Sequence, residues 1–131
     1  MGRPLSTARA CDGVTLVELM IAIAILATVA AIAVPAYRDY VETAAVGVLA
    51  AEIATMEPFQ QDTRLRTGSY GIGTWDFATD DTSLTVATGW APRNSNGATY
   101  VVVADEAGYR VTATDPEGRT VCRIMPARRP C

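Results

Sequence analysis

The fold is decided by the stretch Val14-Thr-Leu-Val-Glu-Leu-Met-Ile-Ala-Ile-Ala-Ile-Leu-Ala-Thr-Val-Ala-Ala-Ile-Ala-Val34, which is almost purely apolar and carries a single charge, Glu18. At about 1.5 Å of rise per residue, a helix of roughly 20 apolar residues is long enough to cross a bilayer. A carboxylate near the centre of such a helix costs roughly 2.5–3.5 kcal/mol or more. The stretch therefore predicts a membrane-spanning helix, and Glu18 predicts a functional site that needs a partner.

The residues before this run, 1–13, are polar and carry Arg3 and Arg9. A basic segment that precedes an apolar run stays on the cytoplasmic side under the positive-inside rule. In an ordinary secretory signal a small-residue cleavage site follows the apolar run, whereas here Gly13 precedes it. We therefore expect the apolar helix to stay on the mature protein. An uncleaved signal anchor that tethers an exported domain is the alternative.

The N-terminal pattern as a whole resembles one known family. It consists of Gly13, the residues Val14-Thr-Leu-Val-Glu-Leu-Met20, the apolar run, Pro35 and Tyr37-Arg-Asp-Tyr40. This pattern resembles the N-terminus of type IV pilins and prepilins, with their class III N-methylation signal. A weaker resemblance extends to Leu65-Arg-Thr-Gly-Ser-Tyr70, which is similar to the stretch that leaves the long helix in pilins of the PilE type.

The resemblance implies roles for three residues. A prepilin peptidase would cut between Gly13 and Val14 and would methylate the new amino group of Val14. Glu18, the fifth residue of the mature chain, would pair with the N-terminal amine of a neighbouring subunit during filament assembly. The family usually has Phe where this chain has Val14, and a basic residue where it has Asp12. Both departures bear on the efficiency of processing.

The composition excludes most kinds of catalytic site. The net charge is −3, and the chain has neither His nor Lys, so that all eleven basic residues are Arg. Without His the commonest general base and metal ligand is absent, and without Lys a Ser/Lys dyad is unavailable. We therefore expect a protein that is not an enzyme, with no catalytic residues, no metal and no cofactor.

Three cysteines occur, Cys11, Cys122 and Cys131. Cleavage at Gly13 would remove Cys11 and leave an even pair, which in an exported domain indicates a disulfide. A Cys122–Cys131 bridge would close a loop of about ten residues, worth roughly 2–3 kcal/mol. The resemblance points the same way, because many type IV pilins carry a disulfide-bounded loop near the C-terminus. Two unpaired thiols, and a lipid attachment site at Cys11, are the alternatives.

Helical spacing resumes after Pro35, which should kink or loosen the helix locally. From residue 36 to about 66 the helix becomes amphipathic. We expect Pro58 to break or kink it near its end. Its wet face is predicted to carry Arg38, Asp39, Glu42, Glu52 and Glu57, and its packing face Val41, Ala44, Ala45, Val48, Leu49 and Ile53.

The rest of the chain reads as an antiparallel meander joined by short turns. The expected strands are 84–90, 98–104, 109–114 and 119–125, and the turns are Asn94-Ser-Asn-Gly97, residues 105–108 and Asp115-Pro-Glu-Gly118. Four strands packed on the long helix give an α+β, pilin-like fold. The tail, residues 126–131, would be held to the last strand by the disulfide.

Two groups of charged residues suggest ligands more weakly. Asp76, Asp80 and Asp81 lie in an expected loop, residues 71–83, and supply the oxygens that calcium prefers, but they fit no EF-hand spacing. A solvated loop is the alternative. The basic end of the chain could contact DNA phosphates, or it could be a solvated, ion-paired terminus. Its members are Arg119, Arg123, Arg128 and Arg129.

Taken together, these patterns predict a cleaved leader (1–13), an apolar transmembrane and filament-core helix (14–35), its amphipathic second half (36–66) and a β head with a C-terminal disulfide loop (67–131). The resemblance implies a major or minor pilin that supports adhesion, twitching motility or DNA uptake. Its partners would be other pilins in a helical filament, prepilin peptidase and the assembly machinery of the inner membrane. The precursor would lie in the inner membrane with a periplasmic head, and the mature chain in a surface pilus. The alternatives are a type II secretion pseudopilin and a ligand- or DNA-binding module displayed on a filament.

Overall fold

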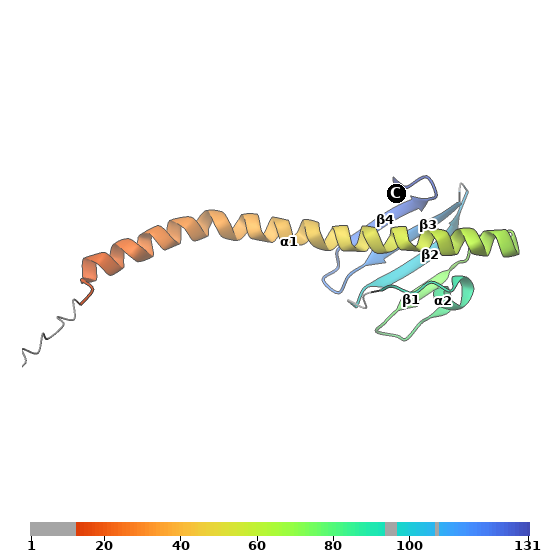
Figure 1. Cartoon of the computed structure of the whole chain (residues 1–131), viewed down its shortest axis with the longest axis horizontal. Coiled ribbons are helices and arrows are strands. Elements are labelled where there is room, and N and C mark those ends of the chain that lie inside the picture. The colour runs from red at the N-terminus through yellow and green to blue at the C-terminus, as the bar shows by residue number, and fades with distance from the viewer. Residues whose placement is uncertain (1–12, 94–96, 107) are drawn as a thin grey trace, which may run out of the picture. The chain divides into compact units, whose positions relative to one another are not determined.

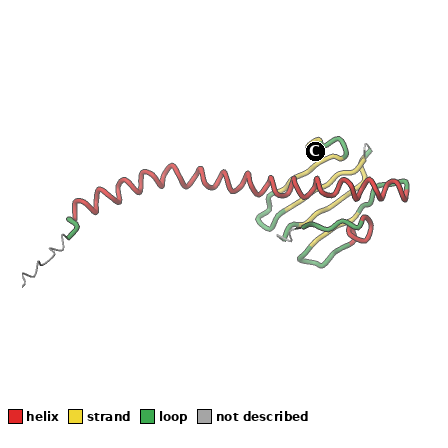
Figure 2. The backbone as a smooth tube through the Cα atoms, in the orientation of Figure 1, coloured by secondary structure: helices red, strands yellow, loops and turns green. Residues whose placement is uncertain are grey.

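The structure, a computed structural model, describes residues 13–93, 97–106 and 108–131 (Figure 1). The chain divides into two compact units, residues 1–39 and 40–131. One long helix, α1 (Leu16–Thr67), begins in the first unit and ends in the second (Figure 2). Residues 1–12 of the expected leader, with Cys11, and residues 94–96 of the expected turn lie outside the described residues.

The first unit consists of the N-terminal part of α1 and the residues just before it. Within the described residues, α1 is the one helix that is long and apolar enough to cross a membrane. Its large apolar side chains from Val14 to Val34 are all solvent-exposed, Val34 the least at 47%. The described part of this unit therefore buries none of its large apolar side chains and offers a continuous apolar surface from Val14 to Val34.

Neither proline breaks α1, which is assigned as helix from Leu16 to Thr67. The expectation that Pro58 breaks the helix is therefore wrong. A proline in a helix leaves the carbonyl four residues earlier without its N–H donor. For Pro58 that residue is Ala54, which is exposed, so water can take the place of the missing donor. The helix ends instead at Gly68, which adopts a φ of 83° and donates its N–H to the Arg64 carbonyl at 2.8 Å.

The second unit contains a five-stranded antiparallel sheet in the order β1-β2-β3-β4-β5. The strands are β1 (Gly73–Asp76), β2 (Thr99–Asp105), β3 (Gly108–Thr114), β4 (Thr120–Met125) and β5 (Arg129–Pro130). The three central strands agree with the predicted ones to within a residue. The α+β layout is confirmed, but the sheet has five strands and not four, because short strands extend it at both edges.

One predicted strand is wrong. Residues 84–90 were expected to be extended, but Ser83–Thr88 form a short helix, α2. Leu84 and Thr88 are buried and lie one helical turn apart, whereas Val86 between them is 86% exposed. A short sequence such as this one is compatible with either a strand or a helix. The left-handed conformation of Gly89 (φ 78°) ends the helix. The missing strand is β1, in the stretch expected to be a loop.

The core lies between one face of the sheet and the part of α1 that follows Tyr40. Leu49, Ile53 and Met56 of α1 are each at most 4% exposed. They pack in one cluster with inward-facing side chains of β2, β3 and β4 and with Trp90. The cluster's sheet residues are Tyr100, Val102, Tyr109, Val111, Ala113, Val121 and Met125.

The amphipathic assignment is right in outline and wrong in two details. Glu52, expected on the wet face, is only 6% exposed, and its carboxylate accepts a hydrogen bond from the Arg93 backbone N–H at 3.3 Å. Val41 and Val48, expected to pack on the sheet, are 41% and 43% exposed. The buried part of α1 therefore starts about two turns later than predicted, at Leu49 instead of Val41.

The outward backbone groups at the β1 edge of the sheet are already bonded, and the strand at the other edge is very short. Residues of an antiparallel strand alternately face toward and away from the neighbouring strand, and in β1 Thr74 and Asp76 face away from β2. The Thr74 N–H donates to Ser83 Oγ at 2.9 Å, and that hydroxyl donates to the Thr74 carbonyl at 3.1 Å. Asp76 and Asp81 exchange two backbone bonds of 2.8 and 3.1 Å. At the other edge β5 has two residues, and Pro130 has no N–H.

Candidate functional site

The start of α1 is organised by a reciprocal pair of side chains, Thr15 and Glu18. The Thr15 backbone N–H and hydroxyl donate to Glu18 Oε2 at 3.3 and 3.2 Å. The Glu18 backbone N–H donates to Thr15 Oγ1 at 3.2 Å. This arrangement is a capping box, which satisfies N–H groups that the first turn of a helix leaves without partners. The carboxylate also lies at the positive end of the helix dipole.

The capping box gives Glu18 a partner within its own chain. Val14 directly precedes Thr15, so an amino group created at Val14 would lie one residue from the N–H that already contacts the carboxylate. The sequence prediction identified Glu18 from its cost in an apolar run but missed Thr15. The Thr-x-x-Glu spacing before an apolar run was the signal that could have found it.

Gly13 and Val14, the expected cleavage position, are both exposed. A Cβ placed on Gly13 would meet no atom within 4 Å. The described residues therefore impose no steric need for glycine at this position. A requirement for glycine there would come from a processing enzyme and not from the fold of the chain.

The apolar part of α1 has one further polar side chain, Thr28. Its hydroxyl donates to the Ala24 carbonyl at 2.9 Å, within its own helix. A hydroxyl that bonds to its own backbone can enter an apolar environment without leaving a donor unpaired. Glu18 is therefore the one charged side chain between Val14 and Val34.

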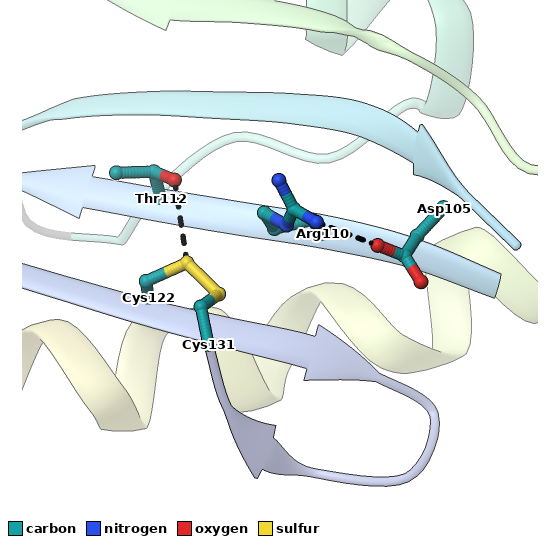
Figure 3. The surroundings of a disulfide bond; sticks show 5 residues. All are labelled: Asp105, Arg110, Thr112, Cys122 and Cys131. Atoms are coloured by element: carbon teal, nitrogen blue, oxygen red, sulfur yellow. Dashed lines mark hydrogen bonds and ion pairs between the residues drawn. A yellow bond between two sulfur atoms is a disulfide. The ribbon is translucent and has the colours of Figure 1, made fainter. Parts of the chain in front are cut away.

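The C-terminal loop of the second unit is closed by a disulfide between Cys122 of β4 and Cys131 (Figure 3). Their Cα atoms are 5.5 Å apart, inside the usual range for a bridge. Thr112 on the neighbouring strand approaches Cys122 Sγ at 3.7 Å. The expected pairing of the two cysteines is therefore present. The tail they close forms β5, beside β4.

Two aspartates of the acidic loop, Asp76 and Asp81, use their carboxylates to stabilise turns of the backbone. The Asp76 carboxylate accepts bonds from the Ala78 N–H and the Thr79 hydroxyl, both at 2.9 Å, and Asp81 accepts one from the Ser83 N–H at 2.9 Å. The Ala78 N–H above all lowers the pKa of Asp76. Asp80 lies in the same turn with a φ of 55°. Within residues 13–93, 97–106 and 108–131, no group of three or more metal-binding side chains is placed to hold an ion.

Two of the four arginines at the basic end are already paired. Arg119 contacts Asp115 at 2.5 Å and Glu117 at 2.9 Å, and Arg128 contacts Glu57 of α1 at 2.6 Å. These pairs neutralise part of the patch that was considered for DNA phosphates. Arg123 and Arg129 have no ion pair in the part of the chain that the structure describes.

Comparison with known proteins identifies the N-terminal pattern. Residues 8–34 match the family described as the prokaryotic N-terminal methylation motif, the class III signal of type IV pilins and prepilins. The match covers Gly13, Val14, the Thr15–Glu18 capping box and the apolar run. No solved structure matches the chain.

Proposed function

We propose, from the premise that residues 8–34 are a class III N-methylation signal, that this chain is a structural subunit of a type IV pilus. The motif supports a precursor of the pilin or pseudopilin kind. One observation carries the proposal further: the described part of the motif is a helix whose apolar side chains are all exposed within its own chain. Such a surface needs lipid or other copies of the same helix to cover it.

The proposed cycle has two states. In the precursor, 14–35 spans the inner membrane, with leader 1–13 on the cytoplasmic side and 36–66 and the head, 67–131, on the periplasmic side. Prepilin peptidase cuts between Gly13 and Val14 and methylates the Val14 amine. In the filament the apolar helices pack against one another.

Glu18 directs assembly in this proposal. Its carboxylate exchanges the Thr15 groups for the Val14 amine of a neighbouring subunit, or shares them with it. Pairing an acid with a cationic amine in an apolar surrounding offsets the cost of burying each charge alone. A subunit that is one step out of register leaves both charges unpaired, so the pair selects the correct register.

The direct test is mass spectrometry of sheared surface filaments and of the inner-membrane fraction. We expect sheared material to contain a chain that begins at methylated Val14 and is two mass units lighter than the dithiol, because of one disulfide. If the chain is a major pilin, it should be the main protein in the sheared material. If it is a minor pilin, it should be present there only in trace amounts. A chain that still begins at Met1 in every fraction would refute processing at Gly13.

Two variants separate processing from assembly. Gly13→Glu should leave the precursor uncut, because in this proposal the peptidase requires glycine before the cut. The variant should still fold, since a Cβ at this position meets no atom within 4 Å. Glu18→Val should insert and be cut normally but should give few filaments. Normal filament yield from a strain that carries only Glu18→Val would refute the charge pairing.

A type II secretion pseudopilin is the second candidate, because the same signal occurs in both classes. It predicts that the mature chain stays wholly with the membrane. A displayed DNA-binding module is a third possibility from another class, supported by Arg123 and Arg129. It predicts salt-dependent DNA binding by intact filaments that is lost when both arginines are replaced by Gln.

A further inference from the structure

The charges of the head are segregated along the sequence. Residues 71–92 contain three acids, Asp76, Asp80 and Asp81, and no basic residue. Residues 118–131 contain four arginines and no acid. Because the sheet order is β1 to β5, the acidic segment lies at the β1 edge and the basic segment at the β4 and β5 edge (Figure 1). Opposite charges therefore lie at opposite edges of one sheet.

The acidic edge carries an exposed aromatic side chain. Phe77, in the turn that follows β1, is 64% exposed. Asp76 and Asp80 flank it, and the bonds from Ala78 and Thr79 to the Asp76 carboxylate fix the turn. We call residues 76–81 the acidic turn. It combines one exposed apolar ring with three carboxylates in six residues.

The basic edge carries a groove of matching character. The groove measures about 240 Å³ and lies between α1, β4 and the tail. Ala50, Ile53 and Ala54 of α1 and Met125 of β4 give it an apolar floor, and Arg123 and Arg128 line it. Arg128 is paired with Glu57, whereas Arg123 has no ion pair within the described residues. The groove therefore combines an apolar floor with Arg123, a cation that has no ion pair within the described residues.

The backbone at both edges restricts how two heads can meet. The outward groups of β1 are bonded to Asp81 and Ser83, and Pro130 interrupts β5. Strand addition, the usual way in which sheet edges associate, therefore finds no open donor on Thr74 or Asp76 of β1, and β5 offers only two residues, one of them a proline. We therefore expect a contact between the two edges to be made by side chains.

We infer that the acidic turn of one copy docks in the Arg123 groove of the next copy, with Phe77 on the apolar floor and Asp80 facing Arg123. The two surfaces are different and lie at opposite edges, so the contact is heterologous and can repeat from copy to copy. This inference rests on the proposed function and names a second contact between subunits, besides that of the N-terminal helices.

The test uses cysteine cross-linking of the full chain. Ala78→Cys in the acidic turn and Ala54→Cys at the groove are both at exposed positions, and Ala78→Cys keeps the backbone N–H that donates to Asp76. In the chain that carries both substitutions, oxidation should join copies into a ladder of disulfide-linked oligomers. Either substitution alone should give no ladder. A control chain with Ala78→Cys and Ser69→Cys should also give none, because Ser69 does not line the groove.

Charge reversal tests the chemistry of the contact. Asp80→Arg or Arg123→Asp in the cross-linkable chain should each lower the ladder by about tenfold, which corresponds to roughly 1.4 kcal/mol. Combining both reversals should restore it, because the pair is then opposite in sign again. Reversal of Glu106, an exposed acid outside the acidic turn, should change nothing. Failure of the combined reversal to restore the ladder would overturn the Asp80–Arg123 pairing.

Cross-linking is carried out on both sheared filaments and membranes, which separates the two proposals. Filaments without a ladder would overturn the docking and leave the pilus function standing. A ladder in membranes without filaments would overturn the pilus function and keep the docking. Absence of both would overturn both.

Discussion

Replacing Gln60 by Leu tests how the end of α1 is tied to the sheet. Gln60 is fully buried, and its amide holds the Gly71 backbone from both sides: Nε2 donates to the Gly71 carbonyl at 2.8 Å, and Oε1 accepts from the Gly71 N–H at 2.9 Å. Gly71 is itself buried. A buried group that loses its partner costs about 1–3 kcal/mol, so two groups cost about 2–6 kcal/mol. Leu regains about 1–2 kcal/mol by burying its apolar surface, which leaves an expected loss of up to about 5 kcal/mol, centred near 2.5 kcal/mol.

The assay is urea unfolding of the full chain in detergent micelles, followed by fluorescence. Trp75 and Trp90 both lie in the second unit, so the signal reports on the head. Gln61→Leu is the matched control, because Gln61 is the neighbouring, half-buried glutamine and makes no side-chain bond to Gly71. If Gln60→Leu unfolds within about 0.5 kcal/mol of Gln61→Leu, the clamp on Gly71 contributes little and the reasoning is refuted.

Three further outcomes are expected. Cys122→Ser should lower the stability of the head by roughly 2–3 kcal/mol through loss of the short loop, and reduction of the native chain should lower it by the same amount in the same urea assay. Burial raises the pKa of Tyr100 to about 12, so the neutral phenol is favoured in the folded state. The contribution of Tyr100 to stability should thus be constant below about pH 10 and fall by up to about 1.4 kcal/mol per pH unit between pH 10 and 12. Buried Tyr109, whose pKa is also raised, adds to the same loss. Tyr100→Phe should therefore reduce the slope of stability against pH without abolishing it, and an unchanged slope would refute the assignment. Thr15→Val should remove the side-chain bonds of the capping box, and it should lower the filament yield by less than Glu18→Val does. Equal filament yields for Thr15→Val and the native chain would show that the capping box is not needed for assembly.

The elements that the sequence predicted well have a local pattern that fits one type of secondary structure much better than any other. The central strands alternate cleanly, and Gly108 and the Asp115-Pro-Glu-Gly118 turn mark their ends. The long helix was recognised from its apolar run and from the helical spacing that resumes after Pro35. Its end was placed within one residue of Thr67.

The elements that the sequence predicted poorly depend on contacts between distant residues. β1 has four residues, all half-buried, and exists because β2 pairs with it on one side and Ser83 covers the other. The burial of Glu52 depends on Arg93, 41 residues later. Neither contact leaves a local pattern. In the candidate site, Glu18 could be predicted from its charge in an apolar run and from the family resemblance. In the head, the role of Gln60 required knowledge of where Gly71 lies.

The covered β1 edge has a consequence for a chain stored in a membrane. Heads anchored to one bilayer share a thin layer, where their local concentration can reach the millimolar range. At such concentrations an open strand edge becomes a template for fibrous aggregates. The hydroxyl of Ser83 removes that template, because it binds both outward groups of Thr74. Chains anchored at high density can therefore meet without adding strand to strand at this edge.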